Sequence, residues 1–250
     1  MNTVYITFHG NLQELLTKRH DENKVINHSF DRRASIKDVI ESLGIPHVEI
    51  ERLLVNGKDV TFDYIATDTD QIDVFGLTPP FDVFSVSVLR PEPLREIRFV
   101  VDVNVGKLAT LLRMSGFDTF YKNGMTDPEL AEICEQEKRI LLTKDCNLLK
   151  RKNVIFGHLV REVDPKKQLA ETINLFSLID KVLPFSRCLV CNRNLVPVAK
   201  KRIIHRLKPL TKKYYDSFYI CMDCDKLYWP GSHREKMEKV LKSVLQAIIF

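Results

Sequence analysis

The sequence predicts a multidomain protein in which an α+β domain is followed by an α/β domain and a small C-terminal module that bears cysteines. Three observations predict this order. The first 80 residues contain strand, helix, hairpin and strand patterns, the pattern after Arg95 alternates between strand and helix, and two Cys-x-x-Cys pairs lie near the C-terminus. At 250 residues, with 44% hydrophobic and 28% charged residues, the chain can bury more than one core.

Four segments of the N-terminal domain have the pattern of a secondary-structure element. They are a strand at residues 4–8, a helix at 35–43, a hairpin at 52–60 and a strand at 70–75. The helix is expected to end at Gly44, and the hairpin to turn at Asn56 and Gly57. This pattern, above all LLVNGKDV followed by DTDQIDVF, resembles the β-grasp fold of ubiquitin-like and sulfur-carrier proteins. Such carriers act through a free C-terminal Gly-Gly, whereas here the chain continues, so we expect a docking role.

Prolines mark the boundary between the first two domains. The segments 78–80 and 91–93 are both rich in proline and favour turns, and the strand-like run FDVFSVSVL between them belongs to one neighbour or the other. We therefore expect a β-grasp domain at residues 1–80, a linker at 81–96, an α/β domain at 97–183 and a final module at 184–250. This module should end in a helix, because residues 232–235 have the capping-box pattern of a helix start.

The pattern after residue 96 predicts a parallel, doubly wound sheet with helices between its strands. Strands are expected at residues 98–101, 140–143 and 155–163. Helices are expected after Asn104, which can cap the first of them, and from Asp127 and Asp164, which both precede proline. The first helix should stop near Gly116.

Two carboxylates directly follow apolar strand runs, Asp102 after the first and Asp145 after the second. Ligands of open α/β sheets bind outside the carboxyl ends of the strands. Asp127 begins the helix before the second of these strands, so it lies either at the same edge or at the far one. Crowded carboxylates repel each other unless a cation neutralises them, and oxygen ligands suit Mg²⁺ or Mn²⁺. The sequence thus predicts a divalent-metal site that activates water for phosphodiester hydrolysis.

Each of these acids also has a structural explanation. Asp127 and Asp164 have the arrangement of helix caps followed by proline. Asp102 and Asp145 can simply begin loops. Glu129 either binds the same metal ion or places a favourable negative charge in a first helical turn.

The six cysteines of a chain from a reducing compartment are metal ligands or buried thiols rather than disulfides. Four of them form two pairs separated by 29 residues, Cys188 with Cys191 and Cys221 with Cys224. Four thiolates in two such turns suit tetrahedral Zn²⁺, and an all-sulfur set leaves no open position for catalysis, so the zinc is expected to be structural. Asn192 and Asp225, which follow the pairs, tolerate the left-handed backbone that a tight turn needs.

The net charge of +5 conceals a strong asymmetry along the chain. Lys and Arg number 9 against 14 Asp and Glu in residues 1–90, 14 against 14 in residues 91–180, and 15 against 5 in residues 181–250. This excess predicts binding to a polyanion, above all nucleic acid, although a solvated basic face is the alternative. The residues expected to contact phosphate are Lys200, Lys201, Arg202, Arg206, Lys208, Lys212 and Lys213.

Four blocks of sequence occur in order over residues 97–235: FVVDVNVGKLATLLRMSGFDT, TDPELAEICEQEKRILLTKD, PFSRCLVCN and CMDCDKLYWPGSH. Together they resemble the Mut-seven carboxy-terminal ribonuclease domain family, a PIN-like nuclease fold with an appended zinc ribbon and often a ubiquitin-like N-terminal domain. The resemblance implies metal-binding roles for Asp102, Asp127 and Asp145, with Glu129 as a fourth candidate, and RNA as the substrate. Where relatives frequently carry another acid, this chain has Asn147.

Two functions follow from the sequence. The first is a ribonuclease in which Mg²⁺ or Mn²⁺ at the acids activates water while the basic zinc ribbon holds single-stranded RNA; Lys107 either contacts a phosphate or is solvated. The second, favoured by Asn147, is a non-catalytic adaptor that docks RNA to ribosomes or another partner through the β-grasp domain. The sequence has neither a signal peptide pattern nor a run of 18 apolar residues, so we expect a cytoplasmic protein without membrane contact.

Overall fold

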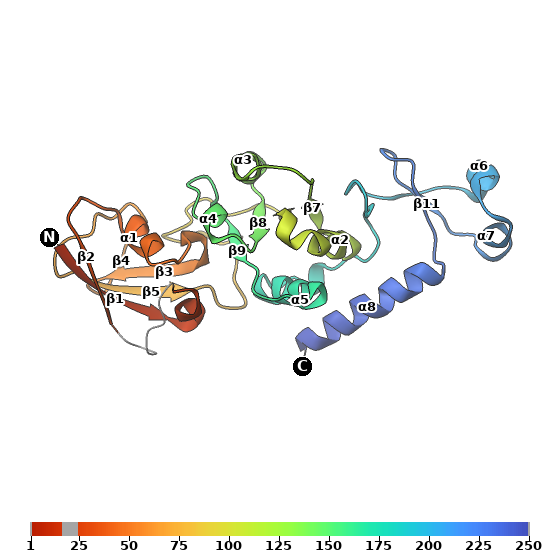
Figure 1. The fold of residues 1–250 in the computed structure, drawn as a ribbon. Coiled ribbons are helices and arrows are strands. Elements are labelled where there is room, and N and C mark those ends of the chain that lie inside the picture. Colours follow the sequence, from red (N-terminus) through yellow and green to blue (C-terminus); the bar gives the residue numbers. More distant parts are fainter. Residues whose placement is uncertain (1, 17–24, 250) are drawn as a thin grey trace.

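The computed structural model describes residues 2–16 and 25–249. Figure 1 shows three parts that follow one another along the molecule, with the last helix running back toward the middle part. In the described part of the chain, no helix combines the length and the hydrophobicity that crossing a membrane requires.

The N-terminal domain is built on a five-stranded mixed sheet with the strand order β2-β1-β5-β3-β4. Its elements are β1 (Asn2–His9), β2 (Ile26–Phe30), α1 (Ile36–Ser42), β3 (Ile50–Val55), β4 (Lys58–Asp59) and β5 (Gln71–Gly76), with the 3-10 helices η1 (Gly10–Leu15) and η2 (His47–Glu49). The central strands β1 and β5 are parallel, whereas the other pairs are antiparallel. Apolar residues of the strands and of α1 form one core between them.

The four elements predicted for this domain are confirmed. The Ser35 hydroxyl accepts a hydrogen bond from Asp38 N at 3.1 Å and so caps α1, and the chain leaves the helix through Gly44, whose φ is +106°. Asn56 and Gly57 both have positive φ, as the two-residue turn between β3 and β4 requires. The sequence does not predict β2, because INHSF is an edge strand with polar residues at its centre.

The strand-like run FDVFSVSVL is not a strand, and residues 81–96 contain neither a strand nor a helix. The Asp82 carboxylate accepts hydrogen bonds from Phe84 N and from the Ser85 hydroxyl. This local turn bends the chain at the start of the run, because a side-chain acceptor competes with extended backbone pairing.

The same segment is nevertheless packed against both domains. Phe81 N donates to Leu175 O, and the buried Arg90 guanidinium donates to the carbonyl oxygens of Val48 and Ile50, each at 2.8 Å. The connection is therefore part of the folded body.

The α/β domain has a four-stranded parallel sheet with the order β7-β6-β8-β9. Its elements are β6 (Arg98–Val101), η3 (Val103–Val105), α2 (Gly106–Met114), β7 (Asp118–Phe120), α3 (Asp127–Glu137), β8 (Ile140–Thr143), α4 (Cys146–Leu149), β9 (Gly157–Leu159), α5 (Pro165–Leu175) and η4 (Ile179–Lys181). Helices α2 and α5 cover one face of the sheet, and α3 and α4 cover the other. The predicted parallel sheet with helices on both faces is confirmed.

The predicted strand at 155–163 is too long, since β9 covers only three of these residues. After β9 the backbone turns toward α5, where Arg161 N and Glu162 N both donate to the Glu171 carboxylate. These amides bond to a side chain instead of a neighbouring strand, and the strand therefore ends early. Asp164 caps α5 by accepting from Lys166 N at 2.8 Å, as the proline that follows it suggests.

The C-terminal part contains a small antiparallel sheet with the order β10-β11-β12. Its elements are β10 (Val196–Pro197), α6 (Lys200–Ile203), η5 (Ile204–Arg206), α7 (Pro209–Tyr214), β11 (Tyr219–Ile220), β12 (Leu227–Tyr228) and α8 (Ser232–Ile249). Residues 186–229 are termed the cysteine module below. The predicted final helix is confirmed: α8 lies against α5 (Figure 1), where Leu241 and Val244 are buried in the core of the α/β domain.

A buried ionic cluster joins the N-terminal and α/β domains. Glu49 is 1% exposed and lies 3.0 Å from His158 Nδ1, while His158 Nε2 lies 3.0 Å from Glu171. Burial alone would lower the pKa of His158, but the two carboxylates raise it to about 9. Both ring nitrogens therefore carry protons and donate to the acids.

Candidate active site and cysteine module

Asp102 and Asp145 lie at the carboxyl ends of two neighbouring parallel strands. Asp102 directly follows β6, and Asp145 comes two residues after β8. The chain moves from β6 to β7 on one side and then crosses to β8 on the other, so the strand order reverses between β6 and β8. Open α/β sheets bind ligands at such a switch point, because the loops diverge there and leave a crevice.

The buried Asp102 carboxylate accepts three hydrogen bonds. Its Oδ1 accepts from Val103 N at 2.6 Å, and its Oδ2 accepts from Asn104 Nδ2 at 2.6 Å and from the Thr143 hydroxyl at 2.7 Å. These donors compensate the loss of water around the charge and fix the orientation of the carboxylate.

Thr143 and Asn104 connect the loop after β6 with the loop after β8. The Thr143 hydroxyl accepts from Asp145 N at 2.9 Å and from Asn104 Nδ2 at 3.1 Å, and Asn104 Oδ1 accepts from Lys144 N at 3.0 Å. The prediction that Asn104 caps α2 is therefore wrong, because its side chain reaches across to the neighbouring loop. The role of Thr143 was not predicted, and its one sequence signal is a hydroxyl at the end of an apolar strand.

Asp145 begins the short helix α4 and uses one of its oxygens to cap it. Oδ1 accepts from Asn147 N at 2.7 Å and weakly from Leu148 N at 3.4 Å. Within the described residues, Oδ2 has no hydrogen-bond partner. One oxygen of this half-buried carboxylate thus remains available to a ligand.

Asp127 is the first residue of α3, and Thr126 occupies the N-cap position. The alternative in which Asp127 caps the helix is therefore wrong. Helix α3 lies over β6 and β8 and ends just before β8 begins, so its first turn lies toward the carboxyl edge of the sheet. In the described part of the chain, the Asp127 carboxylate forms neither a hydrogen bond nor an ion pair.

Glu129 is occupied at the start of α3. Its Oε2 accepts from the Thr126 backbone N at 2.7 Å and from the Thr126 hydroxyl at 2.8 Å. These hydrogen bonds hold the pKa of the exposed Glu129 carboxyl below its usual value. Of the two explanations for this acid, the contacts favour a role in starting the helix.

The three aspartates do not form a compact cage. In residues 2–16 and 25–249, the cysteines are the one group of three or more His, Cys, Asp or Glu side chains whose ligand atoms all lie within 4.8 Å of one another. Mg²⁺ commonly keeps several waters and takes one or two carboxylates together with substrate phosphates. The free oxygens of Asp127 and Asp145 suit that mode of binding.

The four predicted cysteine ligands do converge. Their sulfur atoms lie 3.6 Å apart between Cys188 and Cys224, 3.5 Å between Cys188 and Cys191, and 3.1 Å between Cys191 and Cys221. The edge of a tetrahedron with Zn–S bonds near 2.3 Å is about 3.8 Å, whereas a disulfide needs about 2.05 Å. The cluster can therefore hold a metal such as zinc.

The two cysteine pairs have the same backbone geometry. Asn192 and Asp225 have positive φ values of +68° and +58°, as predicted, and their amides donate to the carbonyl oxygens of Cys188 and Cys221 at 3.0 and 2.9 Å. Burial would raise the pKa of Cys188, but the amides of its own turn and the Tyr228 hydroxyl, 3.1 Å from the sulfur, lower it to about 6. This environment favours the thiolate that a metal needs.

Two of the predicted phosphate-binding residues are already paired with acids. Lys200 Nζ lies 2.8 Å from Asp216, and Arg206 lies 2.9 Å from Asp225. Within the described residues, no ion pair involves the remaining candidates of this module or the exposed Lys107 of α2. These unpaired residues of the module are Lys201, Arg202, Lys208, Lys212 and Lys213.

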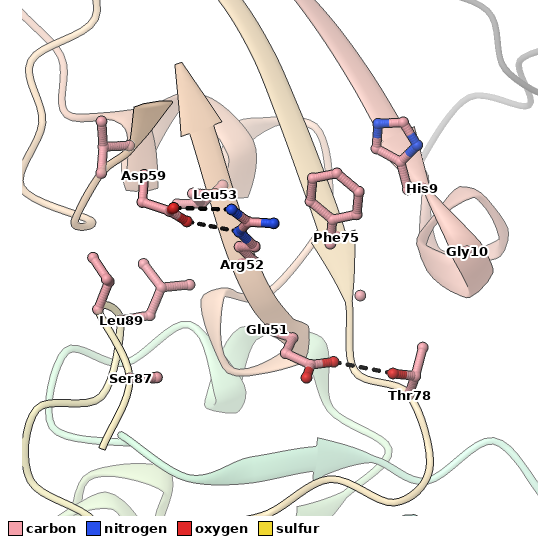
Figure 2. Close-up of a pocket in the computed structure, with 13 residues that line it drawn as sticks. His9, Gly10, Glu51, Arg52, Leu53, Asp59, Phe75, Thr78, Ser87 and Leu89 are labelled. Atoms are coloured by element: carbon pink, nitrogen blue, oxygen red, sulfur yellow. Dashed lines mark hydrogen bonds and ion pairs between the residues drawn. The ribbon is translucent and has the colours of Figure 1, made fainter. Parts of the chain in front are cut away.

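The N-terminal domain and residues 87–89 of the connecting segment line a groove of about 490 Å³, shown in Figure 2. His9 and Phe75 stack there with ring centres 4.3 Å apart, and Arg52 donates to both oxygens of Asp59. Because the charged pair is internally satisfied, the open apolar surface is what the groove offers to a partner. A docking role remains a prediction.

The fold and site define an α/β protein with acids at the switch point of a parallel sheet, joined to a four-cysteine module. Residues 97–241 match the family model of the Mut7-C RNAse domain, and residues 1–82 match that of the Mut7-C ubiquitin domain. The first match covers more than half of the chain, so the protein belongs to the Mut7-C RNAse domain family, with the predicted order of domains. No curated protein and no solved structure matched the chain.

Proposed function

We propose that the protein is a metal-dependent ribonuclease that hydrolyses phosphodiester bonds in single-stranded RNA. The observation that carries the proposal is the position of Asp102 and Asp145 at the switch point of a parallel sheet in a chain of this family. Mg²⁺ or Mn²⁺ at this edge, when bound, polarises a phosphodiester oxygen and activates a water molecule.

We assign different roles to the residues at this edge of the sheet. The free oxygens of Asp127 and Asp145 would hold the ion, and Asp102, held by three donors, keeps the two loops in register through Thr143 and Asn104. Glu129 holds the first turn of α3 and thereby positions Asp127. Such positioning matters because phosphoryl chemistry depends on the alignment of the attacking and leaving oxygens.

We further propose that Zn²⁺ in the cysteine module is structural, because four sulfur ligands leave no open position. The basic side chains of the module then neutralise RNA phosphates, which supplies affinity with little preference for sequence. The N-terminal domain would dock a protein or ribosomal partner through its groove.

Cleavage of labelled single-stranded RNA in the presence of Mn²⁺ tests the proposal. Replacing both Asp102 and Asp145 by asparagine is expected to slow cleavage by at least about a hundredfold, because the anionic oxygens are lost while the shapes are kept. Asp164→Asn is the matched control, since that aspartate caps α5, takes no part in the contacts between the loops of Asp102 and Asp145, and asparagine caps equally well. Equal cleavage by the double variant and the parent would show that the proposed site does not catalyse the reaction.

The salt dependence of RNA binding tests the role of the basic residues. Replacing Lys201 and Arg202 by alanine is expected to reduce the slope of log affinity against log salt by about 1.4, or about 0.7 for each lost phosphate contact on a single strand. Lys200→Ala should change the slope less, because its ammonium is already paired with Asp216. Equal slopes for all variants would mean that these side chains do not contact RNA.

A non-catalytic RNA-binding adaptor is the second candidate. It is favoured by the structural roles that the acids already have, since Asp102 accepts hydrogen bonds from three donors and Asp145 and Glu129 each serve the start of a helix. Tight, salt-sensitive RNA binding without cleavage in Mg²⁺ or Mn²⁺ would support the adaptor and reject the nuclease.

A further inference from the structure

The cysteine module and the start of α8 enclose an aromatic pocket of about 430 Å³. Tyr215 of the turn after α7, Tyr219 of β11 and Trp229 next to β12 contribute rings to its lining, and Lys226 and Arg234 contribute cationic side chains. Most of the lining residues come from α7, β11, β12 and the start of α8 and from the turns between them. Figure 1 shows α7 and β11 beyond the α/β domain.

The rings of this pocket differ in their structural role. Trp229 and Tyr215 pack against the small core of the module, and Trp229 lies 6.5 Å from the Phe218 ring. Tyr219 is 36% exposed and does not belong to that core. The fold therefore does not require the Tyr219 ring, which leaves one aromatic surface of the pocket available to a ligand.

The charge around the pocket selects the kind of ligand. Residues 181–250 carry 15 Lys and Arg against 5 Asp and Glu, and no ion pair involves Lys226 in the described part of the chain. Arg234 Nε donates to Glu238 at 2.9 Å, and the guanidinium lies 4.7 Å from the centre of the Phe185 ring. Its positive charge is therefore held in one place in the pocket lining. Aromatic faces beside free cations are the features that bind an unpaired base together with its phosphate.

We propose that this pocket receives one unpaired base of a single-stranded RNA, stacked on Tyr219 beside Trp229, with a neighbouring phosphate at Lys226. The choice of RNA rests on the proposed function, whereas the base-binding pocket rests on the lining residues. Duplex RNA does not fit, because its bases are already stacked inside the helix.

The intrinsic fluorescence of Trp229, the one tryptophan of the chain, reports directly on the pocket. The full-length, zinc-loaded protein is titrated with a short single-stranded RNA and, separately, with inorganic polyphosphate, in buffer without Mg²⁺ or Mn²⁺. The RNA is expected to quench Trp229, whereas polyphosphate, which has charge but no base, is expected to bind without quenching.

Tyr219→Ala is expected to weaken RNA binding between about fivefold and a hundredfold, the usual effect of removing one stacking ring. Tyr219→Phe should restore binding, because the ring alone stacks. Tyr214→Ala is the matched control: this tyrosine is 63% exposed in the same module but does not line the pocket. Zinc content and circular dichroism establish that each variant is folded.

The outcomes separate this inference from the nuclease proposal. Base-dependent quenching and a selective effect of Tyr219→Ala support the pocket even if no RNA is cleaved under any condition. Equal quenching by RNA and polyphosphate, equal effects of the two alanine variants, or an absence of RNA binding would overturn it, even if Mn²⁺-dependent cleavage is observed.

Discussion

Zinc removal, or replacement of Cys221 by serine, is expected to unfold the cysteine module while the two preceding domains remain folded. The buried apolar core of the module consists of only Ile203, Leu207 and Phe218. So small a core cannot offset the conformational entropy of ordering the chain, so we expect the proposed zinc ion to supply the difference. Structural zinc sites contribute apparent binding free energies of about 10–16 kcal/mol, which is the largest effect expected for a single change in this protein.

Two signals separate the module from the rest of the chain in this experiment. Trp229 fluorescence and proteolysis between residues 186 and 229 follow the module, and thermal unfolding by circular dichroism follows the domains. Cys146→Ser is the matched control, because that thiol lies in the α/β domain, where it donates to Gly44 O, and should leave zinc content unchanged. A zinc-free module that keeps its Trp229 emission and resists protease would contradict the prediction.

Glu49→Gln is expected to destabilise the whole protein by about 3–5 kcal/mol. Glu49 is buried at the boundary between the first two domains, where it accepts from His158 and from Leu159 N. Removing one partner of a buried pair leaves the other charge without compensation, which costs more than the pair itself contributes. Urea unfolding measures the change, and Glu51→Gln, two residues along the chain and partly exposed, should have little effect.

The same ionic cluster makes the free energy of unfolding decrease both at high pH and at low pH. The pKa of His158 is about 9 in the folded protein against 6.5 ordinarily, so its contribution is complete below about pH 6.5 and is lost as pH rises to 9. Burial would raise the pKa values of Glu49 and Glu171, but His158 lowers them below 4.5, so their contribution is lost as pH falls below that value.

The contribution of this cluster to the free energy of unfolding should therefore be largest between about pH 4.5 and 6.5. Glu49→Gln should flatten the alkaline decrease, because it removes the main cause of the raised pKa of His158. The urea midpoints of the parent and the variant, measured at pH 6 and at pH 9, test whether the alkaline decrease is flattened. An unchanged alkaline slope would mean that His158 is not the titrating group.

Features that depend on neighbouring residues were predictable from the sequence. The Ser35 cap, the Asn56-Gly57 turn and the left-handed Asn192 and Asp225 each follow from the conformations that one or two residues allow. The absence of a strand in FDVFSVSVL also has a local cause. The alternation of apolar residues suggested strand pairing, but the Asp82 carboxylate accepts a hydrogen bond from Phe84 N, a backbone amide that a strand would pair with its neighbour.

Features that join distant segments were not predictable in the same way. Glu49 and His158 are 109 residues apart, and neither lies in a motif, so no pattern indicated that they meet in a buried ion pair. Strand β7 has three residues and pairs with β6, and side chains from outside the strand also hold it: Thr119 N donates to Asn192 Oδ1, and Arg113 donates to Thr119 O. Such elements owe their existence to partners elsewhere in the fold, which a window of sequence does not contain.

The sequence by itself determined which groups are present: acids after two apolar strands, four thiols at metal-binding spacing, and a basic excess in the last 70 residues. Only the tertiary structure decided that β6 and β8 are neighbours, and hence that Thr143 and Asn104 connect the loops of Asp102 and Asp145. The physical reason is that each residue type fixes its own side-chain chemistry, whereas strand order results from backbone pairing and burial summed over the whole domain.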